Sequence, residues 1–210
     1  MADLTVFIVD TNDQIVARKS VSALTNATSH TLSFPSLTPG TYTVYANTEG
    51  NDWFSMPSEN ESSFANYKDA LLKDVTSGAP VVQNDRMPLT GKQEMTIGEG
   101  TSTRTVSMLR TVGKLSVNAV NQRTSAVTAQ TPTISSIIPQ TGWVFKHDNI
   151  LTASNPLHIP TIDNEGHVVI PGATHLLLET LLYETSTNAG FTFTMTSIRF
   201  NKTYRTTSRV

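Results

Sequence analysis

The 210-residue chain contains no cysteine. This absence excludes disulfide bonds, thiolate-ligated metal sites, iron–sulfur clusters and a cysteine nucleophile. Charged residues are also scarce, at 15% of the chain against about 25% in an average soluble protein. The formal net charge is −2, so the chain lacks the basic footprint with which proteins bind nucleic acids or anionic membranes. No apolar run reaches the roughly 20 residues that a membrane-spanning helix needs.

The sequence shows no signal peptide either. It opens with Met1-Ala2-Asp3 and enters an apolar, strand-like segment at Leu4. A native N-terminus seldom begins so abruptly. We therefore expect a leader segment to precede this sequence in the precursor.

Hydroxyl side chains take the place of charge. The chain has 33 Thr and 20 Ser, about a quarter of its residues. Threonine loses side-chain freedom in a helix but packs well on a pleated surface, so this composition favours strands. The length fits one large domain or two small ones. We predict an all-β fold.

Three segments in the N-terminal part are expected to form strands. Residues 4–9 are apolar on both faces, so this strand should be covered on each side or have an apolar face that awaits a partner. Residues 15–19 should form the second arm of a hairpin. Residues 41–47 alternate as in a half-buried strand. One segment between residues 47 and 87 departs from this pattern. Its apolar residues Phe64, Tyr67, Leu71 and Leu72 recur at helical spacing, which predicts one short helix within residues 60–73.

The segment 105–120 changes the face on which its apolar residues lie. Val106 and Met108 occupy even positions, whereas Val117 and Ala119 occupy odd ones. A one-residue slip sends every side chain to the other face, so this change needs a bulge, a bend or a passage between two cores, with Gly113 as a plausible place. We expect an N-terminal sandwich over residues 1–108 and a C-terminal one over 109–210. A single sandwich with one bulged strand is the alternative.

Five further strands are expected in the C-terminal half, at 133–138, 143–146, 167–170, 175–183 and 191–200. The segment 175–183 is rich in leucine and could form a helix. Its flanking Gly172 and Asn188 and its β-rich surroundings favour a buried strand. About a dozen short strands at this spacing indicate sandwiches.

No motif nominates a metal or a catalytic site. Asp163, Glu165, His167 and His175 lie near one another in sequence, but without a compact ligand spacing. The Asp10-to-Gln14 turn resembles a calcium loop only superficially, since the required Gly and closing Glu are missing. The chain has neither a Gly-x-Ser-x-Gly elbow nor a phosphate-binding loop. We expect no enzyme, no metal and no cofactor.

The aromatic residues Trp53, Phe54 and Trp143 offer one more alternative. Together they could form a platform on which a sugar stacks, although a place in a core or at its rim is the more favoured interpretation. Such a platform would suit a monomeric cell-surface module that binds carbohydrate or protein. Hydrolysis on a β-sandwich is a further possibility that no motif supports.

Five local patterns follow one another in an order that resembles a known family. They are residues 4–10 (LTVFIVD), 41–48 (TYTVYANT), 87–91 (MPLTG), 106–117 (VSMLRTVGKLSV) and 177–185 (LLETLLYET). Together they resemble the FimA/Mfa-type fimbrillins of the Bacteroidetes, the type V pilins with their anchor and tip relatives. The resemblance covers nearly the whole chain.

The resemblance implies two transthyretin-like β-sandwich domains and export as a lipoprotein to the cell surface, the fimbrium and the outer membrane. It implies a shaft, tip or anchor subunit that polymerises by donor-strand complementation and serves adhesion. The partners would be other fimbrial subunits and a ligand on a host or bacterial surface, with no nucleic acid and no membrane insertion beyond the lipid anchor. The lipidated Cys, the basic cleavage site and the removed strand would all precede Met1. Members usually continue with further strands at the C-terminal end, so the second sandwich could be incomplete.

The physics of an unfinished sandwich agrees with this implication. A sandwich that lacks one strand exposes unpaired backbone groups above an apolar core, which a strand from a partner can complete. The doubly apolar first strand is where we expect this polymerisation edge, at Leu4, Val6, Phe7, Ile8 and Val9.

Overall fold

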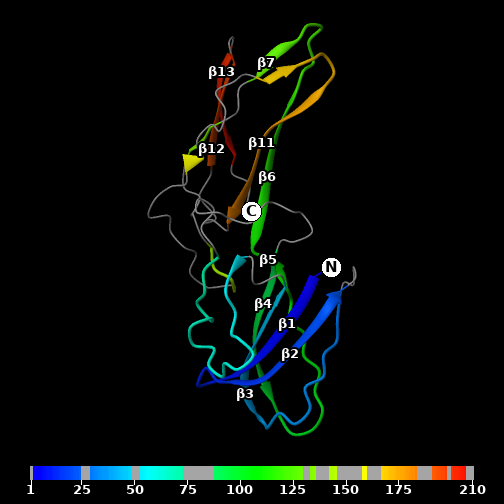
Figure 1. Ribbon diagram of the computed structural model, residues 1–210, viewed down its shortest axis with the longest axis vertical. Helices are drawn as coiled ribbons and strands as arrows, with labels where there is room; N and C mark the ends of the chain where they lie inside the picture. Colours follow the sequence, from blue (N-terminus) through cyan, green and yellow to red (C-terminus); the bar gives the residue numbers. More distant parts are fainter. Residues whose placement is uncertain are drawn as a thin grey trace. The chain divides into compact units, whose positions relative to one another are not determined.

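The computed structural model describes residues 2–24, 29–48, 53–72, 88–129, 133–135, 142–145, 158–159, 167–183, 191–197 and 200–206 (Figure 1). Apart from Trp53, which is helical, the regular structure in these ranges consists of strands, and all the strand pairs are antiparallel. The predicted all-β class is therefore confirmed.

The chain divides into two compact units. Unit 1 comprises Met1–Thr111 together with Thr141–Asn149, and unit 2 comprises Val112–Gln140 and Ile150–Val210. Residues 141–149 thus belong to unit 1, although they follow a part of unit 2 in the sequence. That residues 1–108 and 109–210 are two separate sandwich domains stays a prediction.

Unit 1 contains a five-stranded sheet. Its strands, in the order in which they pair, are β2 (Ile15–Leu24), β1 (Ala2–Asp10), β3 (Gly40–Thr48), β4 (Leu89–Ile97) and β5 (Leu109–Arg110). The hairpin between β1 and β2 closes through the carboxylate of Asp10, whose Oδ1 accepts hydrogen bonds from the backbone N–H groups of Asn12 (2.8 Å) and Gln14 (2.9 Å). These local hydrogen bonds make residues 10–14 an ordinary hairpin turn, in agreement with the superficial nature of its resemblance to a calcium loop.

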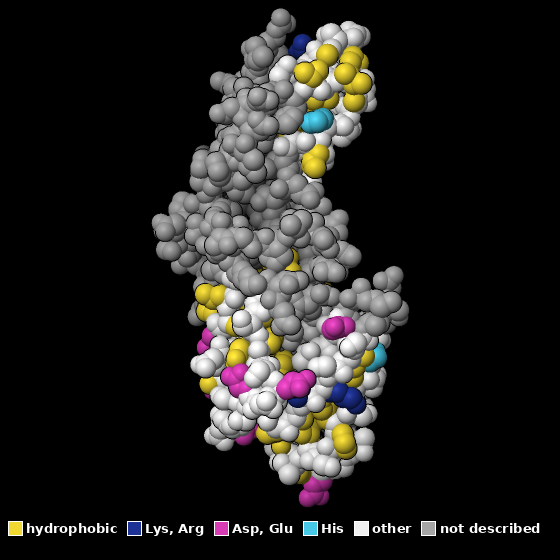
Figure 2. Space-filling view, in the orientation of Figure 1, with side chains coloured by type: hydrophobic (Ala, Val, Ile, Leu, Met, Phe, Trp, Pro, Cys, Tyr) yellow, Lys and Arg dark blue, Asp and Glu magenta, His cyan; other side chains and the backbone are white. Residues whose placement is uncertain are grey.

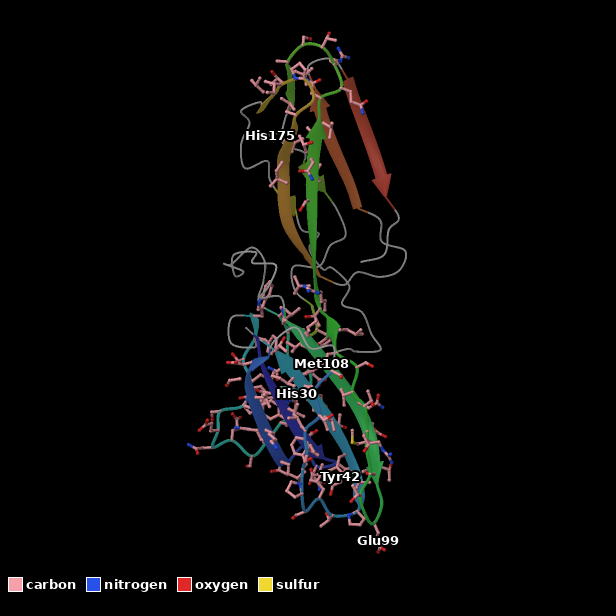
Figure 3. All side chains as sticks on the ribbon, turned by 90° about the vertical axis from the view of Figure 1, so that its right-hand side faces the viewer. His30, Tyr42, Glu99, Met108 and His175 are labelled. Atoms are coloured by element: carbon pink, nitrogen blue, oxygen red, sulfur yellow. The ribbon has the colours of Figure 1, made fainter. Side chains whose placement is uncertain are left out.

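One face of the sheet carries an aliphatic cluster. Its buried members are Leu4, Val6, Ile8, Tyr42, Val44 and Ala46. Side chains from segments that carry no strand pack against the cluster, among them Phe34, Leu37, Val106 and Met108, the last of which is labelled in Figure 3. The even residues of β1 and β3 thus point into one core.

The opposite face of the sheet is aromatic. Phe7 packs on Phe64, with 5.3 Å between the ring centroids, and Tyr45 stacks on Phe64 at 4.3 Å. Phe145 adds an edge-on contact with Tyr45 at 4.9 Å. The expectation that the first strand is covered on each side is confirmed. β3 is more buried than its alternation predicts, because Tyr45 and Asn47, on its second face, are buried as well.

The short helix predicted within residues 60–73 is wrong, since the described part of this segment, up to residue 72, contains turns and isolated bridges. Its backbone groups make only turn-type bonds to each other, such as Tyr67 N–H to Phe64 O (2.9 Å), and pair otherwise with distant segments. Phe64 N–H donates to Asp13 O (2.7 Å), Ser62 O accepts from Ile15 N–H (2.7 Å), and Leu72 N–H donates to Gly142 O (2.8 Å). Of the four apolar residues at helical spacing, Phe64 and Leu72 are buried, whereas Leu71 is 45% exposed.

The change of apolar face within residues 105–120 occurs at a bend at Thr111, between β5 and β6 (Val112–Val120), two residues before Gly113. Val106 and Met108 pack into the aliphatic cluster of unit 1. Ala119 packs against Val169 and Leu177 in unit 2. The segment therefore serves two cores in succession.

Unit 2 contains three small sheets. β6 pairs with β11 (Thr174–Tyr183), and β7 (Val127–Ala129) pairs with β10 (His167–Val169). The third sheet has the order β13-β12-β8-β9, formed by Phe200–Thr206, Phe191–Ser197, Thr133–Ser135 and His158–Ile159. The strand expected at 175–183 is confirmed, whereas the one expected at 191–200 is two strands of a hairpin.

A buried asparagine organises one end of unit 2. Asn121 is 3% exposed, and its Nδ2 donates to Ser125 O (2.9 Å) and Val169 O (2.7 Å). Its Oδ1 accepts from Arg123 N–H (2.9 Å), and its backbone carbonyl accepts from Gly172 N–H (2.8 Å). One side chain thus joins the end of β6 to the ends of β7 and β10.

Candidate assembly surfaces

The predicted polymerisation edge is not an edge of this sheet. β1 pairs with β2 on one side and with β3 on the other, so its backbone is already engaged in two ladders. Leu4, Val6 and Ile8 are buried in the aliphatic cluster, and Phe7 and Val9 are buried on the aromatic face. A strand cannot add beside β1 while these ladders persist, because a strand has only two sides.

The outer strand β2 carries two cations that reach over its two faces. Arg18 donates from Nη1 to Ser58 O (2.7 Å), and its guanidinium lies 4.9 Å from the centroid of the Phe7 ring. Lys19 donates from Nζ to Ser33 O on the other face (3.4 Å). Charged side chains on an outer strand are a common protection against edge-to-edge association. This edge is therefore a poor candidate for strand addition.

The other side of the sheet is covered by a segment without regular structure. β5 pairs only with Leu89 and Thr90 of β4. Beyond them, a Cβ on Gly91 would lie 2.8 Å from Ser107 O, so the two backbones touch and no other residue fits at position 91 without a shift. Arg104 donates from Nη2 to Thr96 O (3.2 Å). Residues 104–108 thus cover β4 at Gly91 and reach it again at Thr96.

Unit 2 presents longer open edges. β6 and β11 pair from Thr174↔Val120 to Tyr183↔Val112, and β11 has one extra residue, Leu177, within this register. No third described strand joins the ladder. Four large apolar residues of this unit are half-exposed or more, namely Val120, Val168, Ile170 and Leu176. Figure 2 shows hydrophobic side chains gathered on the surface of unit 2 near β7, β10 and the start of β11.

The described residues hold no group of three His, Asp or Glu side chains that could bind a metal ion. His175 lies on β11 in unit 2 (Figure 3), whereas Asp163 and Glu165 lie outside the described residues. Nor does the aromatic platform form, because Trp53 and Phe54 are each only 2% exposed and belong to the core.

The electrostatics of unit 1 centre on the aromatic face. Burial, with the carboxylates of Asp13 and Asp69 nearby, raises the pKa of Tyr45 to about 12. The hydrogen bond to Glu61 raises the pKa of Tyr67, and the hydrogen bond to Asp13 raises the pKa of Lys68. The Lys68–Asp13 ion pair (2.6 Å) fastens the covering segment to the β1–β2 turn. These shifts support a stable scaffold and create no reactive group.

Residues 142–145, which we call the clasp, close the aromatic face of unit 1. Val144 and Phe145 are buried, Val144 N–H donates to Ala70 O (3.0 Å), and the Thr90 hydroxyl donates to Val144 O. Trp143 forms an isolated antiparallel bridge with Leu71. The sequence predicts a strand at 143–146 but gives no sign that it returns to the first unit, because a few apolar residues cannot specify their partner.

Comparison with solved structures places the fold among proteins of fimbrial systems. A candidate adhesin from Bacteroides thetaiotaomicron is similar, with a TM-score of 0.59 and 15% identity over 96% of this chain and 70% of that chain. The fimbrial anchor protein Mfa2 from Porphyromonas gingivalis has a TM-score of 0.54 and 12% identity, over 98% and 73%. A fimbrial assembly protein from Parabacteroides distasonis has a TM-score of 0.53 and 12% identity, over 97% and 77%. At these identities the likeness shows the fold.

A search among curated proteins finds no match. The sequence profile of the fimbrillin-A associated anchor proteins Mfa1 and Mfa2, by contrast, matches residues 1–207. This match spans nearly the whole chain and confirms the resemblance carried by the five sequence motifs. The chain belongs to the family of fimbrillin-A associated anchor proteins Mfa1 and Mfa2.

Proposed function

We propose that this protein is a structural subunit of a bacterial surface fimbria and that a strand from a neighbouring subunit completes the β6–β11 sheet of unit 2. Family membership supports the fimbrial role, since the family is one of structural anchor proteins with no enzymatic function indicated. The observation that carries the strand-addition step is the ten-residue strand β11, which holds Leu176 and pairs on one side only, with β6, among the described residues.

The physical argument concerns unpaired backbone groups. A two-stranded antiparallel ribbon is marginally stable in water, and each outer edge presents a row of N–H and C=O groups. An added strand would satisfy these groups along its length, and its alternate side chains would contact the outward-facing Val120 and Leu176. Strand addition is therefore favoured here more than in unit 1, whose outer strands are protected by Arg18, Lys19 and residues 104–108.

Several finer features belong to the same proposal. The two units would be transthyretin-like sandwiches over residues 1–108, completed by the clasp, and 109–210. The protein would be exported as a lipoprotein precursor and act at the cell surface, in the fimbrium and at the outer membrane. Its partners would be other subunits of a homo- or heteropolymer, and adhesion to a host or bacterial surface would be the outcome. No helix in the described ranges is long and apolar enough to cross a membrane.

The alternative function is a monomeric module that binds carbohydrate or protein at the cell surface. The burial of Trp53 and Phe54 removes the sugar-stacking platform that favoured carbohydrate. The exposed apolar residues of unit 2 remain compatible with a protein ligand.

A matched pair of lysine substitutions tests the proposal. Leu176 of β11 is 48% exposed and Val16 of β2 is 45% exposed, so a lysine should be tolerated at either site. Purified protein should cosediment with fimbriae sheared from the cells that produce it. We expect Leu176→Lys to abolish this binding by placing a charge beside the added strand, and Val16→Lys to retain it. Equal binding of the two variants, or no binding by the unmodified protein, would contradict strand addition at β6–β11.

A further inference from the structure

The clasp is held to the rest of unit 1 by non-covalent contacts alone. In sequence order, residues 112–140 of unit 2 separate it from the first part of unit 1, and the chain returns to unit 2 at residue 150. The surface that receives it is formed by residues 70–72, Thr90 and the rings of Tyr45 and Phe64. This surface is therefore a binding site for a short extended peptide, occupied by a segment of the same chain.

The contacts of the clasp are those of a peptide ligand. Two backbone hydrogen bonds fix its direction, from Leu72 N–H to Gly142 O and from Val144 N–H to Ala70 O. The Thr90 hydroxyl donates a third, to Val144 O. Phe145 supplies the apolar anchor, since it is 1% exposed and contacts Tyr45 and Phe64. Extended pairing with one deep aromatic anchor is a recurrent way of recognising a peptide.

We propose that this site also accepts the clasp of a second copy of the chain, so that two copies can exchange residues 142–145. The second copy offers an identical segment, and every contact made within one chain can be remade between two. The local cost of exchange is small because the contacts are the same, and protein concentration decides the balance between the two forms. This contact differs from strand addition at β6–β11 in its site, its unit and its occupant. It does not rest on the fimbrial role.

The absence of native cysteine permits a direct test. Leu71 and Trp143 face each other in an antiparallel bridge, so cysteines at these two positions can form a disulfide only when a clasp is docked. The double variant Leu71→Cys/Trp143→Cys should form this disulfide within one chain. The two single variants, refolded together at high concentration, should form a disulfide-linked dimer only if the clasp of one copy occupies the site of the other.

The control replaces Leu71→Cys by Val16→Cys, because Val16 and Leu71 are both 45% exposed and Val16 does not touch the clasp in the described structure. We expect the Leu71→Cys and Trp143→Cys pair to yield severalfold more dimer than the control pair. Equal yields, or a double variant that forms no internal disulfide, would overturn the proposal.

A second arm separates this proposal from the proposed function. The cysteine pair is repeated with Leu176→Lys in both chains, and the yield of dimer should not change. A loss of the dimer in that background would show that strand addition in unit 2 brings the cysteines together, and the exchange proposal would fail. Size-exclusion chromatography of the unmodified protein, refolded at low and at high concentration, gives a readout that is independent of the substitutions. We expect a dimer at high concentration only, and its absence there would also count against exchange.

Discussion

Unit 1 and unit 2 bury their strands in different ways. In unit 1 the central strand β1 has a neighbouring strand on each side, an aliphatic layer on one face and an aromatic layer on the other. In unit 2 the β6–β11 ladder has two described strands, and its described core consists of Val169 and Leu177 with three smaller contributions around them. Both faces of the first unit's central strand are covered, whereas among the described residues of the second unit β6 and β11 pair on one side only and Val120 and Leu176 are exposed.

If the proposed function holds, one chain combines a protected scaffold in unit 1 with a strand-accepting edge in unit 2. Unit 1 protects its outer strand with the side chains of Arg18 and Lys19 and covers β4 with residues 104–108. Unit 2 places Val120 and Leu176 outward on its longest ladder. The proposed strand addition involves residues of unit 2 alone. The following substitutions break or sharpen this contrast, beginning with the largest expected effect.

Removal of the clasp's anchor should open the closed unit. Phe145→Ala deletes a buried ring that contacts Tyr45 and Phe64, and large-to-small changes of this kind cost about 3–5 kcal/mol. We expect hydrogen exchange to accelerate in β1 and β3, with little change in β6. The matched control is Leu71→Ala, which lies beside the clasp but is half-exposed and should cost far less. Equal protection of β1 in both variants would show that the clasp is not needed to close unit 1.

The buried asparagine should be the corresponding weak point of unit 2. Asn121→Ala removes both Nδ2 hydrogen bonds and leaves the carbonyls of Ser125 and Val169 without their donor, a loss of about 3 kcal/mol. Hydrogen exchange should accelerate in β7 and β10. Gln122→Ala, an exposed neighbour, serves as the control. If the two variants unfold at the same urea concentration, the polar corner does not stabilise unit 2.

Alkaline pH should weaken unit 1 through Tyr45. Its pKa is about 12 in the folded protein and about 10 when unfolded, so between these values the unfolded state loses its proton first. The free energy of unfolding therefore falls as pH rises from 10 to 12, by up to about 2.7 kcal/mol for a shift of two units. Urea titrations at pH 9 and pH 11.5 measure this fall. Tyr45→Phe should show a smaller fall, and an unchanged pH dependence would refute the role of Tyr45.

The ion pair between Lys68 and Asp13 should contribute least. Both side chains are about one-third exposed, and pairs of this kind contribute about 0.5 kcal/mol. Lys68→Ala should lower the midpoint of urea unfolding slightly, and 1 M salt should reduce the difference from the unmodified protein. A loss as large as that of Phe145→Ala would mean that this contact, and not the aromatic layer, holds the covering segment in place.

The sequence predicts the strands of unit 1 well but not their neighbours. Apolar residues on both faces of residues 4–9 correctly predict a strand that is covered on each side, because burial follows directly from side-chain polarity. Whether β1 lies inside the sheet or at its edge depends on pairing with β3, more than 30 residues away, which no local pattern specifies. The same limit explains the error at residues 60–73. The apolar spacing there is helical, yet Phe64 and Leu72 give their N–H groups to Asp13 and Gly142.

The candidate surfaces were less predictable than the strands. The β11 strand can be inferred from its flanking residues. Its pairing with β6, in a ladder that no third described strand joins, is a property of the assembled unit and cannot be inferred locally. The clasp contains four described residues, too few for a period, and its partner surface is built from residues 45, 64, 70–72 and 90. Long-range pairing of short segments thus lies beyond local sequence patterns.

The return of residues 141–149 to unit 1 has a mechanical consequence. The chain crosses between the units three times, after residues 111, 140 and 149, where an ordinary two-domain protein would cross once. A tensile force that separates the units is therefore shared by three covalent connections instead of a single linker. A subunit that holds a fibre to a cell would gain resistance to shear from this threading alone.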